Sequence, residues 1–282
     1  MDINNYLTVA AYQGPIHEGD VKTNLNKILE VTNMAEQRHI DLLCFPETFL
    51  HGYFPNKELA LQHSIDLHSV EFRKLCEQFS HFKHTTILLG LNEYENNKIY
   101  NSVVVIENGE CIGVYRKAYS YVPYEYYSLG QQFPVFEKKG IKYSIIICLD
   151  SSYREPAHIS ALKGARIIFC PSCNRVQKDA RMYNYVQRKS HFISRAYDNN
   201  CWLVVSDIVW DEKDDVCPGF ACILNSDGEV VAKAEPFQEI LITYSIPMTN
   251  LKERKMVRLL GNPDLFEIVK REYEQAKKNN ET

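Results

Sequence analysis

The chain has 282 residues, of which 45% are apolar and 12% are aromatic, so it can bury a substantial core. Its 32 basic and 36 acidic side chains give a formal net charge of −4 and are spread along the whole length. Because no basic tract is present to follow a phosphate backbone, we expect no nucleic-acid partner. No run of about 18 apolar residues occurs, and residues 1–5 carry an acid where a signal peptide is basic, so we expect neither a membrane span nor secretion.

The nine cysteines are an odd number in a long chain. Several of them lie inside apolar runs, namely Cys44, Cys148, Cys170 and Cys201. Buried free thiols behave as small apolar side chains and persist in a reducing compartment, so we expect a cytoplasmic protein. Cys170 and Cys173 have the CxxC spacing of a zinc or redox pair, but no second close pair accompanies them. We therefore expect structural cysteines and no metal site.

Apolar patterns of period two and of period 3.6 alternate along the first half of the chain and predict strands that alternate with helices. Asp20 is placed to cap the first helix, in which apolar residues recur at helical spacing up to Met34. Asn108-Gly109 is a turn signal between the last two strands of this half. The predicted strands are residues 7–12, 42–45, 86–89, 102–106 and 111–115.

The same order of elements repeats in the second half, where Asp227-Gly228 joins the final hairpin. The predicted elements are strands at 143–147, 167–169 and 202–205, helices at 157–163 and 178–198, and hairpin strands at 220–224 and 229–234. Strand–helix–strand–helix–strand–hairpin thus occurs twice, which favours an α/β fold of two mixed sheets packed face to face under helices. The alternative is two doubly wound domains side by side, but no Pro/Gly/Ser-rich linker separates the halves. We expect one domain over residues 1–275 and a polar C-terminal tail over 276–282.

Three polar residues interrupt this pattern directly after predicted strands: Glu47, Lys117 and Cys148. The carboxyl ends of strands in α/β sheets gather at one crevice, so the three side chains can meet there. A thiol can attack a carbonyl carbon, a carboxylate can move protons, and an ammonium can stabilise the negative charge that develops on oxygen. Each residue alone is a weak signal, since a cysteine in an apolar strand is usually part of the core. The combination indicates acyl-transfer chemistry.

The residues around these positions resemble the signature blocks of the nitrilase, or carbon–nitrogen hydrolase, superfamily, and the resemblance covers nearly the whole chain. The three blocks are Phe45-Pro46-Glu47, Tyr115-Arg116-Lys117 and Cys148-Leu149-Asp150. Further matching residues follow in order: Gly52, Tyr53, Pro123, Glu125, Gly130, Glu155, Pro171, Ser172, Arg195 and Ala196. The resemblance implies an α/β protein with a four-layer α-β-β-α sandwich, an internal pseudo-duplication and a Glu-Lys-Cys triad.

By this resemblance, Cys148 is the nucleophile that forms a thioester and Glu47 is the general base. Lys117 and the backbone N–H of Leu149 stabilise the oxyanion. Glu125 matches a second glutamate that supports the lysine and orients the substrate. The resemblance implies no cofactor, and it implies a homodimer or higher homo-oligomer.

The neighbouring motifs place Tyr53, Tyr124, Cys173 and Asn174 in the substrate pocket. Some carbamoyl-amino-acid hydrolases of this superfamily carry arginines where this chain has Ser151 and Ser152, which argues against a substrate carboxylate bound from that position. Arg175 could bind a substrate carboxylate instead, or it could be an ordinary surface arginine, and the sequence favours neither reading.

We expect an enzyme that hydrolyses a small linear amide or an N-carbamoyl amine and releases ammonia. Nitrile hydrolysis by the same triad is the alternative within the superfamily. A silent binding module that keeps the fold is the alternative outside enzymes, although it has no reason to retain all three groups. We expect no membrane anchor and no attached synthetase domain, so we do not expect an acyltransferase or an ammonia-supplying glutaminase subunit.

Overall fold

The computed structural model describes residues 5–121, 124–178, 181–212, 215–252 and 265–280. The first half of the chain contains β1 (Tyr6–Pro15), α1 (Val21–Gln37), β2 (Leu42–Cys44), α2 (Lys57–Gln62), α3 (Val70–Glu77), β3 (Thr86–Glu95), β4 (Lys98–Glu107) and β5 (Glu110–Arg116). The second half contains β6 (Val135–Lys138), β7 (Ile141–Ile145), the 3-10 helix η2 (Cys148–Ser152), α4 (Arg154–Leu162), β8 (Ile167–Pro171), β9 (Val176–Gln177), α5 (Arg181–Asn199), β10 (Trp202–Asp211), β11 (Asp215–Cys217), β12 (Cys222–Leu224), β13 (Val230–Lys233), β14 (Ile240–Pro247), α6 (Met248–Lys252) and α7 (Leu265–Asn280).

Apart from the short strands β9 and β11, which pair with each other and with the end of β10, the strands form two sheets of matching design. In the first, β1, β2 and β3 run parallel, β4 and β5 continue antiparallel, and β14 pairs antiparallel with the other side of β1. In the second, β7, β8 and β10 run parallel, β12 and β13 continue antiparallel, and β6 lies antiparallel beside β7. The far ends of β1 and β10 pair over three residues, which joins the two sheets. The internal duplication predicted from the sequence is therefore confirmed.

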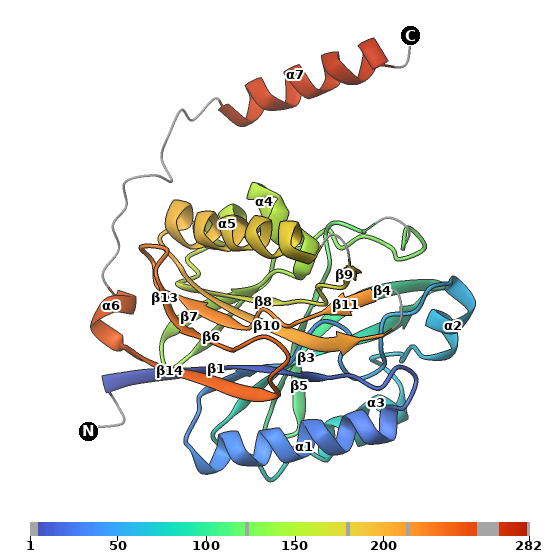
Figure 1. The fold of residues 1–282 in the computed structure, drawn as a ribbon, viewed down its shortest axis with the longest axis vertical. Helices are drawn as coiled ribbons and strands as arrows, with labels where there is room; N and C mark the ends of the chain where they lie inside the picture. The colour runs from blue at the N-terminus through green and yellow to red at the C-terminus, as the bar shows by residue number, and fades with distance from the viewer. Residues whose placement is uncertain (1–4, 122–123, 179–180, 213–214, 253–264, 281–282) are drawn as a thin grey trace.

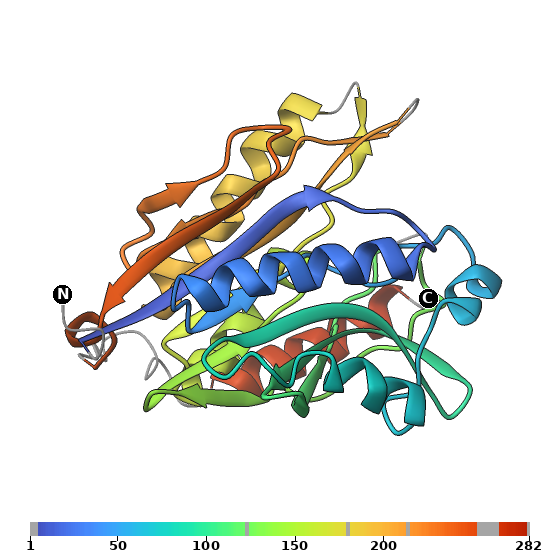
Figure 2. The ribbon, with the colours of Figure 1, turned by 90° about the horizontal axis from the view of Figure 1, so that it is seen from below.

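The two sheets face each other between helices (Figure 1), and α1 lies across the outer face of the first sheet (Figure 2). Period-two alternation assigns successive residues to different layers. In β1, Val9 and Ala11 belong to the core between the sheets, whereas Ala10 and Tyr12 belong to the core under α1 and α3. A third core lies between the second sheet and the helices α4 and α5. The α-β-β-α sandwich is thus built from three apolar layers.

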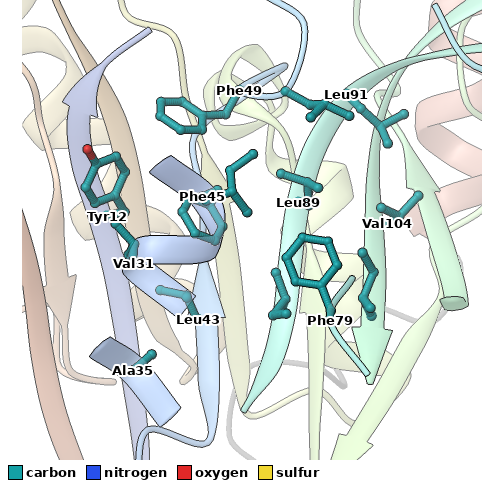
Figure 3. Close-up of a cluster of buried hydrophobic side chains, with 14 of the residues drawn as sticks. Tyr12, Val31, Ala35, Leu43, Phe45, Phe49, Phe79, Leu89, Leu91 and Val104 are labelled. Atoms are coloured by element: carbon teal, nitrogen blue, oxygen red, sulfur yellow. The ribbon is translucent and has the colours of Figure 1, made fainter. Parts of the chain in front are cut away.

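Aromatic rings fill much of the layer between α1, α3 and the first sheet (Figure 3). Phe45 and Phe49 stack with ring centroids 5.8 Å apart, and Tyr12 meets both rings edge-on or tilted. Both phenylalanines are fully buried, and full burial of a ring of this size stabilises the fold by about 1.5–3 kcal/mol. These rings flank Glu47 in the sequence, so the segment that carries the acid is held by the core on either side of it.

The helix start predicted at Asp20 is confirmed, because the Asp20 carboxylate accepts a hydrogen bond from the backbone N–H of Thr23 at 3.0 Å. Strands β6, β9, β11 and β14 were not predicted from the sequence. The expected boundary at residue 276 falls inside α7, which continues to Asn280, so the last described residues are helical. Within the described residues, no helix combines the length and the apolar character that a membrane crossing needs.

Candidate active site

The candidate active site lies where β2, β5 and β7 end. Glu47 follows β2 by three residues, Lys117 follows β5 directly, and Cys148 follows β7 by three residues. Hydrogen bonds between neighbouring chain segments fix these ends, since the Glu47 N–H donates to Ser172 O at 3.3 Å and the Lys117 N–H donates to Asn101 O at 2.9 Å. The strand ends that carry Glu47 and Lys117 are thereby held in place.

Glu47 and Lys117 form a buried ion pair, with Lys117 Nζ 2.6 Å from Glu47 Oε1. Asn101, a fully buried residue of β4, donates from Nδ2 to the same Oε1 at 2.7 Å. Both donors bind one carboxylate oxygen, so Oε2 has no hydrogen-bond donor among the described residues. A buried charge is tolerated only when it is paired and hydrogen-bonded, as this one is. The geometry leaves Oε2 available for proton transfer.

Cys148 occupies a strained backbone position at the start of η2. Its φ is +43°, in the left-handed region that disfavours side chains with a Cβ, and such a residue costs about 1–3 kcal/mol. The sharp turn presents the thiol at the surface of the site, and Cys148 is partly exposed although Ile145, Ile146 and Ile147 before it are fully buried. Its Sγ lies 3.7 Å from Asn174 Oδ1. A strained strand-to-helix turn that exposes a nucleophile is a recurrent design in hydrolases.

Asp150 ties the cysteine turn to the lysine loop. One carboxylate oxygen accepts from the Ile147 N–H at 2.9 Å and from the Tyr115 hydroxyl at 2.7 Å. The other accepts from the N–H groups of Ala118 and Tyr119 at 3.2 and 2.9 Å. These four bonds connect residues on either side of Lys117 to the turn that carries the thiol. Asp150 therefore fixes the spacing between the thiol and the ammonium.

The charges near Lys117 favour its protonated form. Burial alone would lower the pKa of the Lys117 ammonium, but the charges of Glu47, Tyr53 and Cys148 outweigh burial and hold that pKa well above its usual value. Lys117 is therefore a cation at neutral pH. Glu47 and Cys148 both favour the charged form of Lys117.

The predicted pocket residues lie around this site. The Tyr53 ring centroid is 5.6 Å from Lys117 Nζ, and the Tyr124 ring is 4.3 Å from the Tyr53 ring. Burial raises the pKa of the Cys173 thiol, and the charges of Glu47 and Cys148 raise it further. Asn174 is held by Asp207 of β10, which accepts from its Nδ2 at 2.6 Å and from its N–H at 3.1 Å. Tyr53 therefore faces the ammonium, Tyr124 packs on Tyr53, and Asn174 lies beside the thiol.

The structure does not place Glu125 beside Lys117. Glu125 is exposed and lines a separate open cavity together with Lys98 and Arg116, and no hydrogen bond or ion pair joins it to Lys117. The reason is local, because this loop packs the rings of Tyr124 and Tyr127 against Tyr53, and Glu125, which follows Tyr124, is exposed to the solvent. Burying two rings is favourable, whereas burying a carboxylate without a partner is costly. Leu149 follows Cys148 in η2 and is partly exposed.

Other sequence-based candidates have ordinary structural environments. Cys170 is fully buried in β8, and no group of three metal-ligating side chains occurs among the residues described. Ser151 caps its own turn by donating to Cys148 O at 2.7 Å. Pro123, one of the matched motif residues, lies outside the described residues. Asn101 and Asp207 were not predicted as site residues. Each is a polar residue inside an otherwise apolar strand, and that pattern could have indicated them.

The sandwich and the side chains at its strand ends agree with the matches to known proteins. The family model for carbon–nitrogen hydrolase matches residues 8–256. The chain therefore belongs to the carbon–nitrogen hydrolase family, a family of the nitrilase superfamily, and the resemblance in its motifs is confirmed.

Three similar proteins illustrate the family. A glutamine-dependent NAD(+) synthetase of Aquifex aeolicus is 31% identical over 255 residues, which are 86% of this chain and 42% of the synthetase, so the chain spans less than half of that relative. Nit3 of Saccharomyces cerevisiae superposes with a TM-score of 0.78 at 20% identity, over 92% of this chain and 96% of Nit3. A mutant amidase of Nesterenkonia sp. AN1, with the acetamide moiety of fluoroacetamide added to its active-site cysteine, superposes with a TM-score of 0.73 at 19% identity, over 89% and 95% of the two chains. The expected nitrilase-like fold is confirmed.

Proposed function

We propose that this protein is a cysteine-dependent amidase that hydrolyses a small linear amide or an N-carbamoyl amine and releases ammonia. The observation that carries the proposal is the buried Glu47–Lys117 ion pair beside the strained, partly exposed Cys148. The pair supplies a carboxylate oxygen for proton transfer and a cation for an oxyanion, next to a thiol. No cofactor enters the proposed reaction.

In the first half-reaction, Cys148 Sγ bonds to the carbonyl carbon while its proton moves to Glu47 Oε2. The carbonyl oxygen becomes an oxyanion, which Lys117 Nζ and the Leu149 N–H stabilise. The tetrahedral intermediate then collapses, the C–N bond breaks, and Glu47 returns the proton to the leaving nitrogen. Ammonia departs and a thioester remains on Cys148.

In the second half-reaction, water attacks the thioester carbon and gives a proton to Glu47. The same two donors hold the second oxyanion. The C–S bond breaks, the acid is released, and Glu47 returns the proton to the thiolate. With an N-carbamoyl amine, the released carbamic acid breaks down to the amine and carbon dioxide. Every proton taken by Glu47 is returned, so the enzyme is regenerated.

The Nesterenkonia amidase supports a nucleophilic cysteine in this fold, since the acetamide moiety on its active-site cysteine forms when the thiol displaces fluoride from fluoroacetamide and the amide stays intact. For Cys148 we propose attack on the carbonyl carbon of an amide. A nitrile can form the analogous covalent thiol adduct, and the triad alone does not separate the two substrate types. Ammonia release from paired amides and nitriles of equal carbon number distinguishes them, and we expect the amides to react faster.

The proposal is tested by ammonia release from a panel of short amides together with mass spectrometry of the intact protein. We expect turnover and an acyl adduct with the natural chain, and neither with Cys148→Ala. Cys111→Ala, which removes an exposed cysteine, is the matched control and should keep both signals. An unmodified natural chain that releases no ammonia from any amide, carbamoyl amine or nitrile would favour a silent binding module.

A further inference from the structure

A carboxamide lies beside the thiol and is held from behind by a buried carboxylate. Asn174 Oδ1 is 3.7 Å from Cys148 Sγ, so the thiol faces a hydrogen-bond acceptor. At the other end of the same side chain, Nδ2 donates to Asp207 Oδ2 at 2.6 Å. The mechanism proposed above uses neither Asn174 nor Asp207.

Asp207 decides which end of the carboxamide faces the thiol. An ionised carboxylate accepts hydrogen bonds and donates none, so Asn174 must turn its NH2 group toward Asp207 and its oxygen toward Cys148. Asp207 is fully buried in β10, and its Oδ1 accepts the N–H groups of Asn174 and Ile208 at 3.1 and 3.0 Å. Asn174 therefore cannot exchange its two ends without losing the bond to Asp207.

The backbone on both sides of Asn174 is fixed as well. The Ser172 N–H donates to Ser206 O at 2.9 Å, and Arg175 Nη2 bonds to the carboxylate of Glu18. The Arg175 side chain is 16% exposed, so it is not an ordinary surface arginine. The oxygen beside the thiol is thus an acceptor whose place is set before any substrate binds.

The carbonyl carbon that Cys148 attacks carries three substituents, and only one of them suits this oxygen. The carbonyl oxygen is itself an acceptor and needs the donors of Lys117 and Leu149, and an alkyl chain donates nothing. The amide nitrogen carries N–H donors and is bonded to the carbon that Sγ approaches to about 3–3.5 Å. A distance of about 2.9 Å from that nitrogen to Oδ1 fits the separation of 3.7 Å between Sγ and Oδ1.

We propose that Asn174 recognises the leaving nitrogen of the substrate through Oδ1, and that Asp207 is the residue that positions Asn174. This rests on the proposed amidase function. When the thiol proton moves to Glu47, a substrate N–H replaces the S–H as the donor to Oδ1, so the oxygen does not face a bare thiolate. The bond then strengthens as Glu47 returns the proton to the nitrogen, because a nitrogen that gains positive charge is a better donor.

The consequence is a preference for C–N bonds over C–O bonds. The leaving oxygen of an ester has no hydrogen to donate, and its lone pairs face those of Oδ1. A site built to bond an N–H group rejects the analogue that lacks it. Asn174 is therefore the residue that determines specificity for the leaving group.

The test compares the short amide that turns over fastest with the methyl ester of the same acid. Both substrates give the same thioester, and chromatography of the released acid gives kcat/KM for each after spontaneous ester hydrolysis is subtracted. Asn174→Ala should lower the ratio of the amide constant to the ester constant by about 10-fold or more, the worth of one hydrogen bond to a group that gains charge. Asn199→Ala, at a buried asparagine that bonds to Arg195 and His158, should keep the natural ratio.

Asp207→Asn tests the orientation of the carboxamide. The new side chain keeps its oxygen on the two backbone N–H groups and turns its NH2 group to Asn174, which must then point its own NH2 group at the sulfur. The ratio of the two constants should fall at least as far as in Asn174→Ala. The double variant should have the ratio of Asn174→Ala alone, because Asp207 acts through Asn174.

Alkylation of Cys148 by iodoacetamide gives a second readout, which a mere loss of stability would not move. Mass spectrometry of the peptide that contains Cys148 follows the rate as a function of pH. A donor beside the sulfur favours the thiolate, so the inflection should move to lower pH by about one pH unit in Asp207→Asn. An unmoved inflection overturns the role of Asp207.

An unchanged ratio in Asn174→Ala, with the melting temperature preserved, overturns the assignment and leaves the amidase proposal intact. If Asn174→Ala does not fold, the ratio and the inflection in Asp207→Asn decide in its place. If no amide turns over in the natural chain, the amidase proposal fails, and calorimetric titration of Cys148→Ala with butyramide tests the site. Affinity that falls by about 5-fold or more when Asn174→Ala is added upholds recognition of the nitrogen, and equal affinity or no binding overturns it.

Discussion

Asn101 offers a sharp test of the arrangement around the catalytic acid. Its side chain donates to Glu47 Oε1 at 2.7 Å, while its backbone oxygen accepts from the Lys117 N–H at 2.9 Å. Replacement by alanine removes the first bond and keeps the second. Glu47 is then held by Lys117 alone, and its Oε2 is no longer directed by a second donor. A hydrogen bond to a charged group contributes about 1.5–3 kcal/mol, so kcat/KM for an amide should fall by about 10- to 150-fold in Asn101→Ala.

The assay is steady-state ammonia release, with kcat and KM determined separately. Because the lost bond positions the proton carrier and touches no substrate, the fall should be in kcat with little change in KM. Asn101→Asp should be worse than Asn101→Ala, since a second carboxylate beside Glu47 repels it, and its pH optimum should move because the two acids share a proton.

The matched control is Asn199→Ala. Asn199 is also a buried asparagine, with bonds to Arg195 O at 2.9 Å and to His158 Nδ1 at 3.1 Å, and it contacts no triad residue. Its loss should lower stability to a similar extent and leave kcat unchanged. If Asn101→Ala keeps kcat within about twofold of the natural protein, the reasoning on the position of Glu47 is refuted.

Three further predictions follow from the same site. Lys117→Ala should lower kcat for an amide by about 100- to 1000-fold, the worth of one oxyanion donor, whereas Lys233→Ala at an exposed lysine should leave kcat unchanged. Gly90→Ala should lower both kcat and the melting temperature, because a Cβ there would lie 2.4 Å from a backbone oxygen of the turn that carries the acid, whereas Gly140→Ala meets no atom within 4 Å and should lose only about 1 kcal/mol of stability for its positive φ. Burial raises the pKa of Asp150 from 3.8 in the unfolded chain to about 6, so its contribution to the free energy of unfolding is full below pH 4 and falls by about 3 kcal/mol as pH rises past 6. Urea unfolding of the natural protein and of Asp150→Asn at pH 4 and pH 7 measures this, and a difference between the two proteins that does not change with pH contradicts it.

Local patterns in the sequence were sufficient for most of the architecture. The apolar period reports which face of an element is buried, so the strand and helix order, the duplicated unit and the cap at Asp20 were predicted from it. The edge strands β6 and β14 were missed because they are half-exposed and carry weak alternation. β6 pairs with β7 and β14 pairs with β1, and their strand conformation depends on this pairing. A local sequence pattern does not reveal such pairing.

The site residues also fall into those that the sequence could predict and those that it could not. Glu47, Lys117 and Cys148 were predicted because each stands in a short motif directly after a strand, and parallel strands bring such ends together. Glu125 was predicted from its motif too, but its orientation depends on whether the rings beside it or its carboxylate are buried. A motif records residue order and not the direction in which a side chain points.

The sequence by itself determined the family, the layered α/β fold and the three groups of the proposed triad, since these follow from local spacing. Only the tertiary structure decided that Asn101 binds the acid, that Asp150 links the thiol turn to the lysine loop, and that Arg175 meets Glu18. Glu18 and Arg175 are 157 positions apart in the chain. Contacts over such separations are set by how the sheets and loops pack, and no period in the sequence encodes them.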